Sequence, residues 1–215
     1  MREYGQESNQ TVLFLVDAGR TMGMTLGART AFDHALDAAM TMGHAALRHG
    51  DRVGLMVFDR SMRVWQPPRT GRRTAARLIQ STYNEFPSLH ETDFAAAFRH
   101  LSTNVRRRSL VVLLTAVQDE VVAANATAVI RALGSRHLPL VVWLRDPDLT
   151  ALTESPAREE EEWFARAAAA ELVTWRERSL TDLRKRGALV VDCAPDQLTS
   201  ELLGAYMEIK ARRLL

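Results

Sequence analysis

The sequence predicts an α/β fold: a doubly wound, mostly parallel central sheet of the Rossmann-like type, with one antiparallel edge strand. One observation is a series of continuous apolar runs, which are typical of strands covered on both faces. A second is that segments with helical spacing of apolar residues separate these runs, and this alternation favours parallel pairing with right-handed crossovers. The chain has 215 residues, of which 47% are hydrophobic, so we expect a single domain over residues 1–215.

The first half of the chain begins this alternation. An apolar run that ends at Asp17 predicts the first strand, and Gly50 after a basic turn ends the helix that follows. Alternating residues after Asp59 predict a half-exposed strand in a hairpin at the edge of the sheet, stopped by Pro67-Pro68. We expect strands at residues 11–16, 52–58 and 62–66, and helices at about 31–48, from 70 or 71 to about 83, and from 94 to about 101.

The second half continues the alternation. We expect strands at residues 109–115, 138–144 and 187–192, and helices at about 122–135, from 155 onward, and at about 197–210. Ser155 before Pro156 is typical of a helix start, and the acidic run at residues 159–162 complements the helix dipole. This helix is expected to turn an apolar stripe inward, made of Trp163, Phe164, Ala167, Ala168, Leu172 and Trp175.

Composition argues against several classes of function. The net charge is +2, and nearly all of the positive charge is scattered arginine, which argues against a nucleic-acid partner. Cys193 is the single cysteine, which excludes an internal disulfide and a zinc site built on thiolates, and we expect it to pack as a small hydrophobe. No apolar stretch reaches the roughly 20 residues of a membrane span, and the polar start is not a signal peptide, so we expect a soluble, cytoplasmic protein.

The loop after the first strand is the first candidate site. Open α/β sheets bind ligands at the carboxyl ends of their strands, and here Asp17 and Thr21 flank Gly19. Asp17 either binds a ligand or receives backbone N–H groups of its own loop. Gly19 reflects either backbone conformation or close packing. Thr92 lies at a helix start, where a threonine is more often a cap than a ligand.

A set of ordered segments forms a more specific pattern. The segments are Asp17–Met22, Gly50–Leu55 with Phe58-Asp59, Thr92–Phe94 with Ala97, Arg107–Val112, Arg136–Val141, Arg145–Pro147 and Tyr206–Arg212. Together they resemble the von Willebrand factor A domain and, more narrowly, the bacterial family called Domain of Unknown Function number 58. The resemblance implies a metal-ion-dependent adhesion site, with the pattern Asp-x-Ser-x-Ser on one loop, a threonine on a second and an aspartate on a third. Carried over by position, its metal ligands would be Asp17, Thr21 and Thr92.

The adhesion-site pattern is incomplete at two positions. Gly19 stands where the first serine is expected, and Ala116 stands where the third-loop aspartate is expected. One carboxylate and two hydroxyls remain. This set predicts a degenerate site with weak magnesium (Mg) binding at most, because magnesium prefers several hard oxygen ligands. Asp93 and Asp119 are near enough in the sequence to supply a missing carboxylate.

The resemblance implies a non-enzymatic protein-binding module that works as an adaptor with a MoxR-type AAA+ ATPase. One alternative is a haloacid-dehalogenase-like hydrolase with Asp17 as its nucleophile, although Gly19 replaces the general acid of that pattern. Another is a purely structural assembly domain. Full-length relatives often carry membrane-spanning segments before this domain. An anchored form would lie at the inner face of the inner membrane. The sequence leaves open whether the chain is a truncated piece or a soluble variant.

Overall fold

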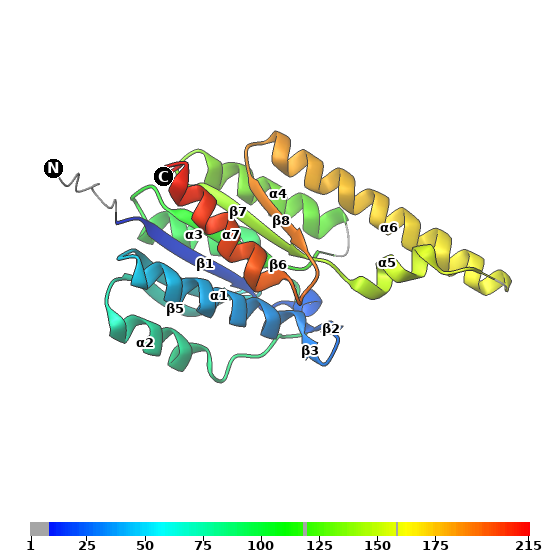
Figure 1. The fold of residues 1–215 in the computed structure, drawn as a ribbon, viewed down its shortest axis with the longest axis horizontal. Helices are drawn as coiled ribbons and strands as arrows, with labels where there is room; N and C mark the ends of the chain where they lie inside the picture. Colours follow the sequence, from blue (N-terminus) through cyan, green and yellow to red (C-terminus); the bar gives the residue numbers. More distant parts are fainter. Residues whose placement is uncertain (1–8, 118–119, 158) are drawn as a thin grey trace.

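Six strands form the central sheet (Figure 1). The computed structural model describes residues 9–117, 120–157 and 159–215. The strands of the sheet are β1 (Thr11–Asp17), β4 (Arg52–Phe58), β5 (Met62–Arg69), β6 (Leu110–Thr115), β7 (Leu138–Leu144) and β8 (Leu189–Cys193). Their order is β5-β4-β1-β6-β7-β8, and neighbours are parallel except β4 and β5. The predicted fold class is therefore confirmed, including its antiparallel edge.

Helices cover both faces of this sheet. They are α1 (Ala31–Arg48), α2 (Arg72–Thr82), α3 (Phe94–Asn104), α4 (Glu120–Gly134), α5 (Pro147–Glu154), α6 (Glu160–Lys185) and α7 (Leu198–Ala211). A 3-10 helix, η1 (Arg20–Gly23), and a hairpin of β2 (Thr25–Leu26) and β3 (Arg29–Thr30) connect β1 to α1. Helices α1 and α7 pack on one face, and α3, α4 and the carboxyl-terminal half of α6 pack on the other. Phe14 and Leu15 of β1 belong to different cores, which explains why its run is apolar throughout.

The edge strand β5 is longer than expected. It was predicted to stop at Pro67-Pro68, but it includes both prolines and continues to Arg69. An edge strand pairs on one side only, so a proline can lie in it without breaking a ladder hydrogen bond. The register with β4 shifts here, and a Cβ at Gly54 would lie 2.8 Å from the Gln66 carbonyl oxygen. Glycine at position 54 therefore allows the two strands to approach closely.

Helix α6 begins later than the sequence indicates. Ser155 is not its cap but follows the last residue of a separate, unexpected helix, α5. That helix begins at Pro147, where the Asp146 carboxylate accepts the Asp148 N–H at 2.9 Å. α6 begins after Glu159, and acidic residues fill its first turn as expected. The prediction of a start at Ser155 is wrong because proline is also common just after a helix end.

The expected inward stripe of α6 is only partly buried. Trp175 packs against Trp143 in the core, with ring centroids 6.1 Å apart. Trp163 and Phe164 are instead 56% and 69% exposed, and Leu172 is exposed as well. Figure 1 shows the reason: the carboxyl-terminal half of α6 lies on the sheet, whereas its amino-terminal half projects with α5 beyond the carboxyl ends of the strands. None of the described helices, α6 included, is long and apolar enough to cross a membrane.

A buried charged cluster lies at the amino-terminal ends of the strands, opposite the end that carries Asp17. The fully buried Asp51 carboxylate accepts the Gln10 N–H at 3.0 Å, the Tyr206 hydroxyl at 2.5 Å and the Lys210 ammonium at 3.0 Å. Tyr206 and Lys210 come from α7, and Asp51 precedes β4. Two distant segments of the resemblance pattern therefore meet at one carboxylate, which anchors the last described helix to the sheet.

Candidate functional site

Asp17 ends the central strand β1, between β4 and β6. Its side chain is fully buried. Oδ1 accepts the Thr92 hydroxyl at 2.6 Å and the Gly19 backbone N–H at 2.8 Å. Oδ2 accepts the Thr115 hydroxyl at 2.7 Å. Donors from three separate segments of the chain therefore converge on one carboxylate.

Thr92 reaches Asp17 because position 19 is a glycine. A Cβ at Gly19 would lie 2.0 Å from Thr92 Oγ1 and 3.1 Å from Asp17 Oδ1. Gly19 has a φ of −74°, which any residue adopts, so close packing rather than backbone conformation accounts for the glycine. The expectation that Thr92 caps a helix is wrong: Asp93 is the N-cap of α3, and its carboxylate accepts the Ala96 N–H at 2.8 Å.

Two loops are joined around this contact, at residues 18–24 and residues 83–93. The Ser88 N–H donates to the Ala18 carbonyl at 2.7 Å, and the Arg20 N–H donates to the His90 carbonyl at 2.8 Å. Arg20 also forms an exposed ion pair of 2.8 Å with Glu91. The hydrogen bond between Thr92 and Asp17 is therefore the buried member of a set that fixes the two loops against each other.

Thr21 and Asp93 make no hydrogen bond to the Asp17 carboxylate among those of the described residues. Thr21 is buried on η1, and within the described ranges the hydrogen bonds to Asp17 come from other residues. Asp93 faces the start of its own helix. Asp119 lies outside the described residues. The structure thus brings Asp17 and Thr92 together and leaves Thr21 beside them.

Thr115 is a site residue that the sequence patterns did not reveal. It ends β6, one place beyond Leu114, which pairs with Val16 of β1. This register sets the Thr115 hydroxyl beside Asp17. The only signal in the sequence is a polar residue that ends a buried strand, and its use as a signal requires knowing that β6 is the neighbour of β1.

The sequence model of the family described as "Protein of unknown function DUF58" matches residues 1–158. The chain belongs to this family. The match includes Asp17, Thr21 and Thr92, and the closing Tyr206–Arg212 segment lies beyond it. No curated protein sequence matches the DUF58 chain.

Solved structures show which fold the DUF58 chain has. An aerotolerance-related membrane protein from Bacteroides fragilis is 14% identical with a TM-score of 0.59, and the alignment covers 94% of this chain and 99% of that one. The SpRpn10 VWA domain is 11% identical with a TM-score of 0.56, over 91% and 94% of the two chains. BatB from Bacteroides thetaiotaomicron is 11% identical with a TM-score of 0.56, over 94% and 99%. The DUF58 chain therefore has the von Willebrand factor A fold.

The donors at Asp17 do not fit a resident magnesium ion in this arrangement. Magnesium requires near-octahedral oxygen coordination and usually keeps several waters. Here both carboxylate oxygens accept hydrogen bonds from hydroxyls, and the side chain has no exposed surface. Position 116 offers a buried alanine instead of a carboxylate. Within the described part of the chain, no group of three or more His, Cys, Asp or Glu side chains is placed to hold a metal.

The electrostatics of Asp17 agree with this geometry. Burial raises the pKa of Asp17 above its usual value, and the negative charge of Asp59 acts in the same direction. The hydrogen bonds from Thr92, Thr115 and Gly19 favour the charged form and oppose the rise without cancelling it. Asp17 is therefore a buried carboxyl group surrounded by hydrogen-bond donors of the protein itself. This environment favours the second of the two roles expected from the sequence, in which Asp17 accepts hydrogen bonds from the chain and does not bind a ligand.

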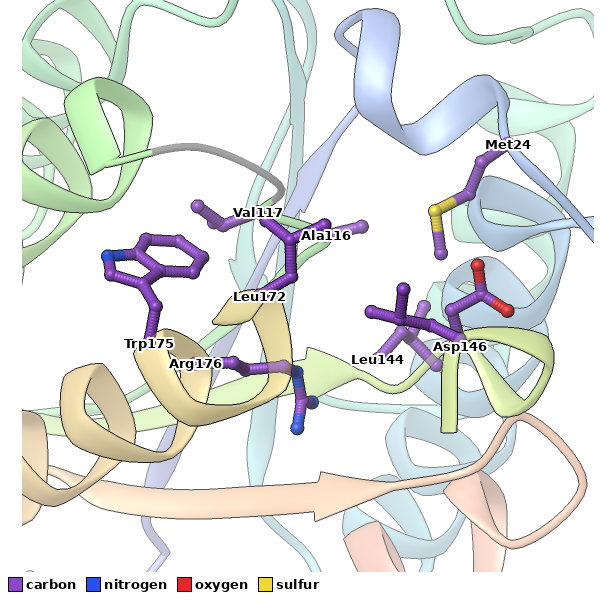
Figure 2. A pocket seen from close by; sticks show the side chains of 9 residues that line it. Met24, Ala116, Val117, Leu144, Asp146, Leu172, Trp175 and Arg176 are labelled. Atoms are coloured by element: carbon purple, nitrogen blue, oxygen red, sulfur yellow. The ribbon is translucent and has the colours of Figure 1, made fainter. Parts of the chain in front are cut away.

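An apolar pocket of about 370 Å³ opens at the same edge of the sheet (Figure 2). Its lining comes from the ends of β6 and β7, the segment after η1, and helices α5 and α6; the residues are Met24, Ala116, Val117, Leu144, Asp146, Leu149, Leu172, Trp175 and Arg176. The two charged residues of the lining have partners outside the pocket: Arg176 forms an ion pair of 2.7 Å with Asp192, and Asp146 caps α5. The other lining residues are apolar. Ala116, at the position of the missing aspartate, therefore helps to make this pocket apolar.

Cys193 is no candidate for a nucleophile. Its thiol is buried at the end of β8, and burial raises its pKa to about 11. A thiol with such a pKa is protonated at neutral pH, and the thiolate is the reactive form. The expectation that Cys193 packs as a small hydrophobe is confirmed.

Proposed function

We propose that this DUF58 protein is a non-enzymatic protein-binding module that engages its partner at the carboxyl edge of the sheet. Asp17, Thr21 and Thr92 form a degenerate metal-ion-dependent adhesion site there. In this proposal the site contributes a fixed pair of loops to the binding face, and metal is not required for recognition.

The apolar pocket at Ala116 carries the proposal. It lies at the edge where open α/β sheets bind ligands, and its lining would accept an apolar side chain of a partner. The neighbouring loops are already joined by hydrogen bonds between Ser88 and Ala18 and between Arg20 and His90. A preformed surface of this kind loses less conformational entropy on binding.

The proposed partner is a MoxR-type AAA+ ATPase, for which the chain would act as an adaptor. The support for this partner is family resemblance, and the pocket supports only the chemistry of the contact. Such a partner would place the protein in the cytoplasm, or at the inner face of the inner membrane if it is anchored.

The haloacid-dehalogenase-like alternative has less support. A nucleophile must present a lone pair to an incoming substrate. Both oxygens of Asp17 instead accept hydrogen bonds from threonine hydroxyls, and the side chain is fully buried. The purely structural alternative predicts that no partner binds at this edge, and the same experiment decides between it and the proposal.

The test is binding of the purified chain to a MoxR-type AAA+ ATPase, measured by biolayer interferometry. Leu149→Glu places a charge in the apolar pocket and should weaken binding by at least about tenfold. Leu152→Glu is the matched control, because Leu152 is an exposed residue of the same helix that does not line the pocket. Equal affinities of all three proteins, or no binding by the wild type, would contradict the proposal.

The metal is tested separately by calorimetric titration of the chelator-treated protein with magnesium and manganese. We expect no saturable binding up to about millimolar concentrations, because the only carboxylate of the pattern is engaged internally. Saturable binding that is lost in Asp17→Ala would show a working adhesion-type site and overturn the metal-free form of the proposal.

A further inference from the structure

The amino-terminal half of α6 is a helix with no sheet beneath it. It projects with α5 past the carboxyl ends of the strands (Figure 1). Across residues 160–174 of α6, Ala169 is the residue that the structure buries. Trp163 and Phe164 lie largely in solvent, next to the acidic first turn of the helix. Two adjacent exposed aromatic side chains on a projecting helix are typical of a protein contact.

One face of this projecting half can be followed along the helix. At about 100° per residue, Glu160, Phe164 and Ala168 are each offset by about 40° from the one before, so the three lie within about 80° on one side of the helix. Further along, the same face carries Trp175 and Arg178, where α6 lies on the body of the protein. The face therefore changes along its length from acidic and aromatic at the free end to aromatic and basic at the attached end.

A groove runs beside the attached end, between α4 and α6. It has a volume of about 550 Å³. Ala124 and Ala128 of α4 and Trp175 of α6 give its lining apolar surface, and Arg131 and Arg178 add positive charge beside the ion pair of Arg186 with Asp182. An occupant with aromatic side chains and carboxylates would match it. The amino-terminal end of α6 has this composition.

We propose that two copies of the chain pair through their α6 helices in antiparallel orientation, so that Trp163 and Phe164 of each copy enter the α4–α6 groove of the other. Such an interface is isologous, and each contact occurs twice. In the register that aligns the two faces, Glu160 lies opposite the partner's Arg178, and Phe164 lies within one residue of the partner's Trp175. This inference concerns a different surface from the proposed partner pocket and does not depend on it.

The middle of the face suits a close helix crossing. Residues 165 and 167–170 are all alanine, so the two backbones could approach closely over Ala168 near the two-fold axis, with the exposed Glu171 of each copy flanking the contact. Charge also favours this occupant over an anionic membrane surface, which the glutamates at the helix start would repel. A second copy offers both the apolar groove and the arginines.

The first test is the oligomeric state by sedimentation velocity over a range of concentrations. The wild-type chain should form a dimer, and the double variant Trp163→Ser with Phe164→Ser should raise the dissociation constant by at least about tenfold. Both side chains are exposed in the single chain, so at concentrations where both proteins are monomeric the variant should keep the wild-type unfolding temperature. A wild-type chain that stays monomeric at high concentration, or a dimer that the variant leaves intact, would overturn the proposal.

The second test addresses the antiparallel register. Glu160→Arg alone and Arg178→Glu alone should each weaken the dimer, and the two changes in one chain should restore it, because every Glu160 faces an Arg178. Ala168→Cys near the axis should form an intermolecular disulfide under mild oxidation, whereas Ala170→Cys on the opposite side of the helix should not. Equal cross-linking at both positions, or a combined charge variant no stronger than the single ones, would refute this register.

Discussion

The hydroxyl of Thr92 fills the space that a side chain at position 19 would need, since a Cβ at Gly19 would lie 2.0 Å from Thr92 Oγ1. In the adhesion-site pattern, position 19 is a serine. The missing serine and the hydrogen bond from Thr92 to Asp17 are therefore coupled: the glycine makes room for the threonine to donate to the carboxylate. A hydroxyl that would face a metal in the complete pattern here satisfies a buried charge.

This coupling predicts a context-dependent cost of Gly19→Ala. In the wild-type background we expect a loss of roughly 2 kcal/mol in the free energy of unfolding, in the usual range for an overpacked site. In a Thr92→Ala background the oxygen is absent, so the same substitution should cost much less. Urea unfolding of the four proteins gives the double-mutant cycle. Additive effects would show that Thr92 does not constrain position 19.

Asp17→Asn should change how stability depends on pH. Because the folded-state pKa of Asp17 is raised, the stabilising contribution of this group is present below the unfolded value of 3.8 and is lost as pH rises through the folded pKa. The asparagine variant has no such loss, so it should gain stability relative to the wild type as the pH rises above the unfolded value of 3.8. Urea unfolding at several pH values measures this difference. A difference that stays constant with pH would mean that burial does not dominate the titration of Asp17.

Strand positions were predictable from the sequence because a strand that is buried on both faces consists of a continuous run of apolar residues. The run that ends in Asp17 and the run at 138–144 are apolar throughout, and both match the observed strands closely. Gly50 is also explained by local chemistry, because its φ of 80° is one that glycine adopts readily.

Features that depend on tertiary neighbours were not predictable in the same way. The periodicity of α6 indicates an apolar stripe, but it contains no information on whether a sheet lies beneath Trp163 and Phe164. The Thr115 contact depends on the register between β1 and β6. For Gly19 the sequence left two explanations open, and only the position of Thr92 on a distant loop decides between them.

Tyr206→Phe should destabilise the protein by about 1–3 kcal/mol, because it leaves one oxygen of a buried carboxylate with fewer donors. The Tyr206 hydroxyl donates to Asp51 Oδ2 at 2.5 Å, and both residues are fully buried. Tyr83→Phe is the matched control, since Tyr83 is 80% exposed, and its effect should be close to zero. Thermal and urea unfolding measure both variants. Equal effects of the two substitutions would mean that Lys210 and the Gln10 N–H together satisfy Asp51.

His137→Leu should make the protein less sensitive to mild acid. His137 is buried just before β7, and neither ring nitrogen has a hydrogen-bond partner among the described residues. Burial lowers its pKa, and the charges of Arg136 and Arg108 act in the same direction. Its contribution to stability is therefore present above the unfolded value of 6.5 and is lost as pH falls toward the lower folded pKa.

Leucine at position 137 removes this titration and takes away the two buried ring nitrogens that have no hydrogen-bond partner among the described residues. We expect the variant to be at least as stable as the wild type at neutral pH, and to gain relative stability as the pH falls below the unfolded value of 6.5. His44→Leu, at an exposed position of α1, controls for the loss of a histidine that is not buried. Parallel pH profiles of the wild type and His137→Leu would show that His137 is protonated equally in the folded and unfolded chains, in contradiction to its buried position.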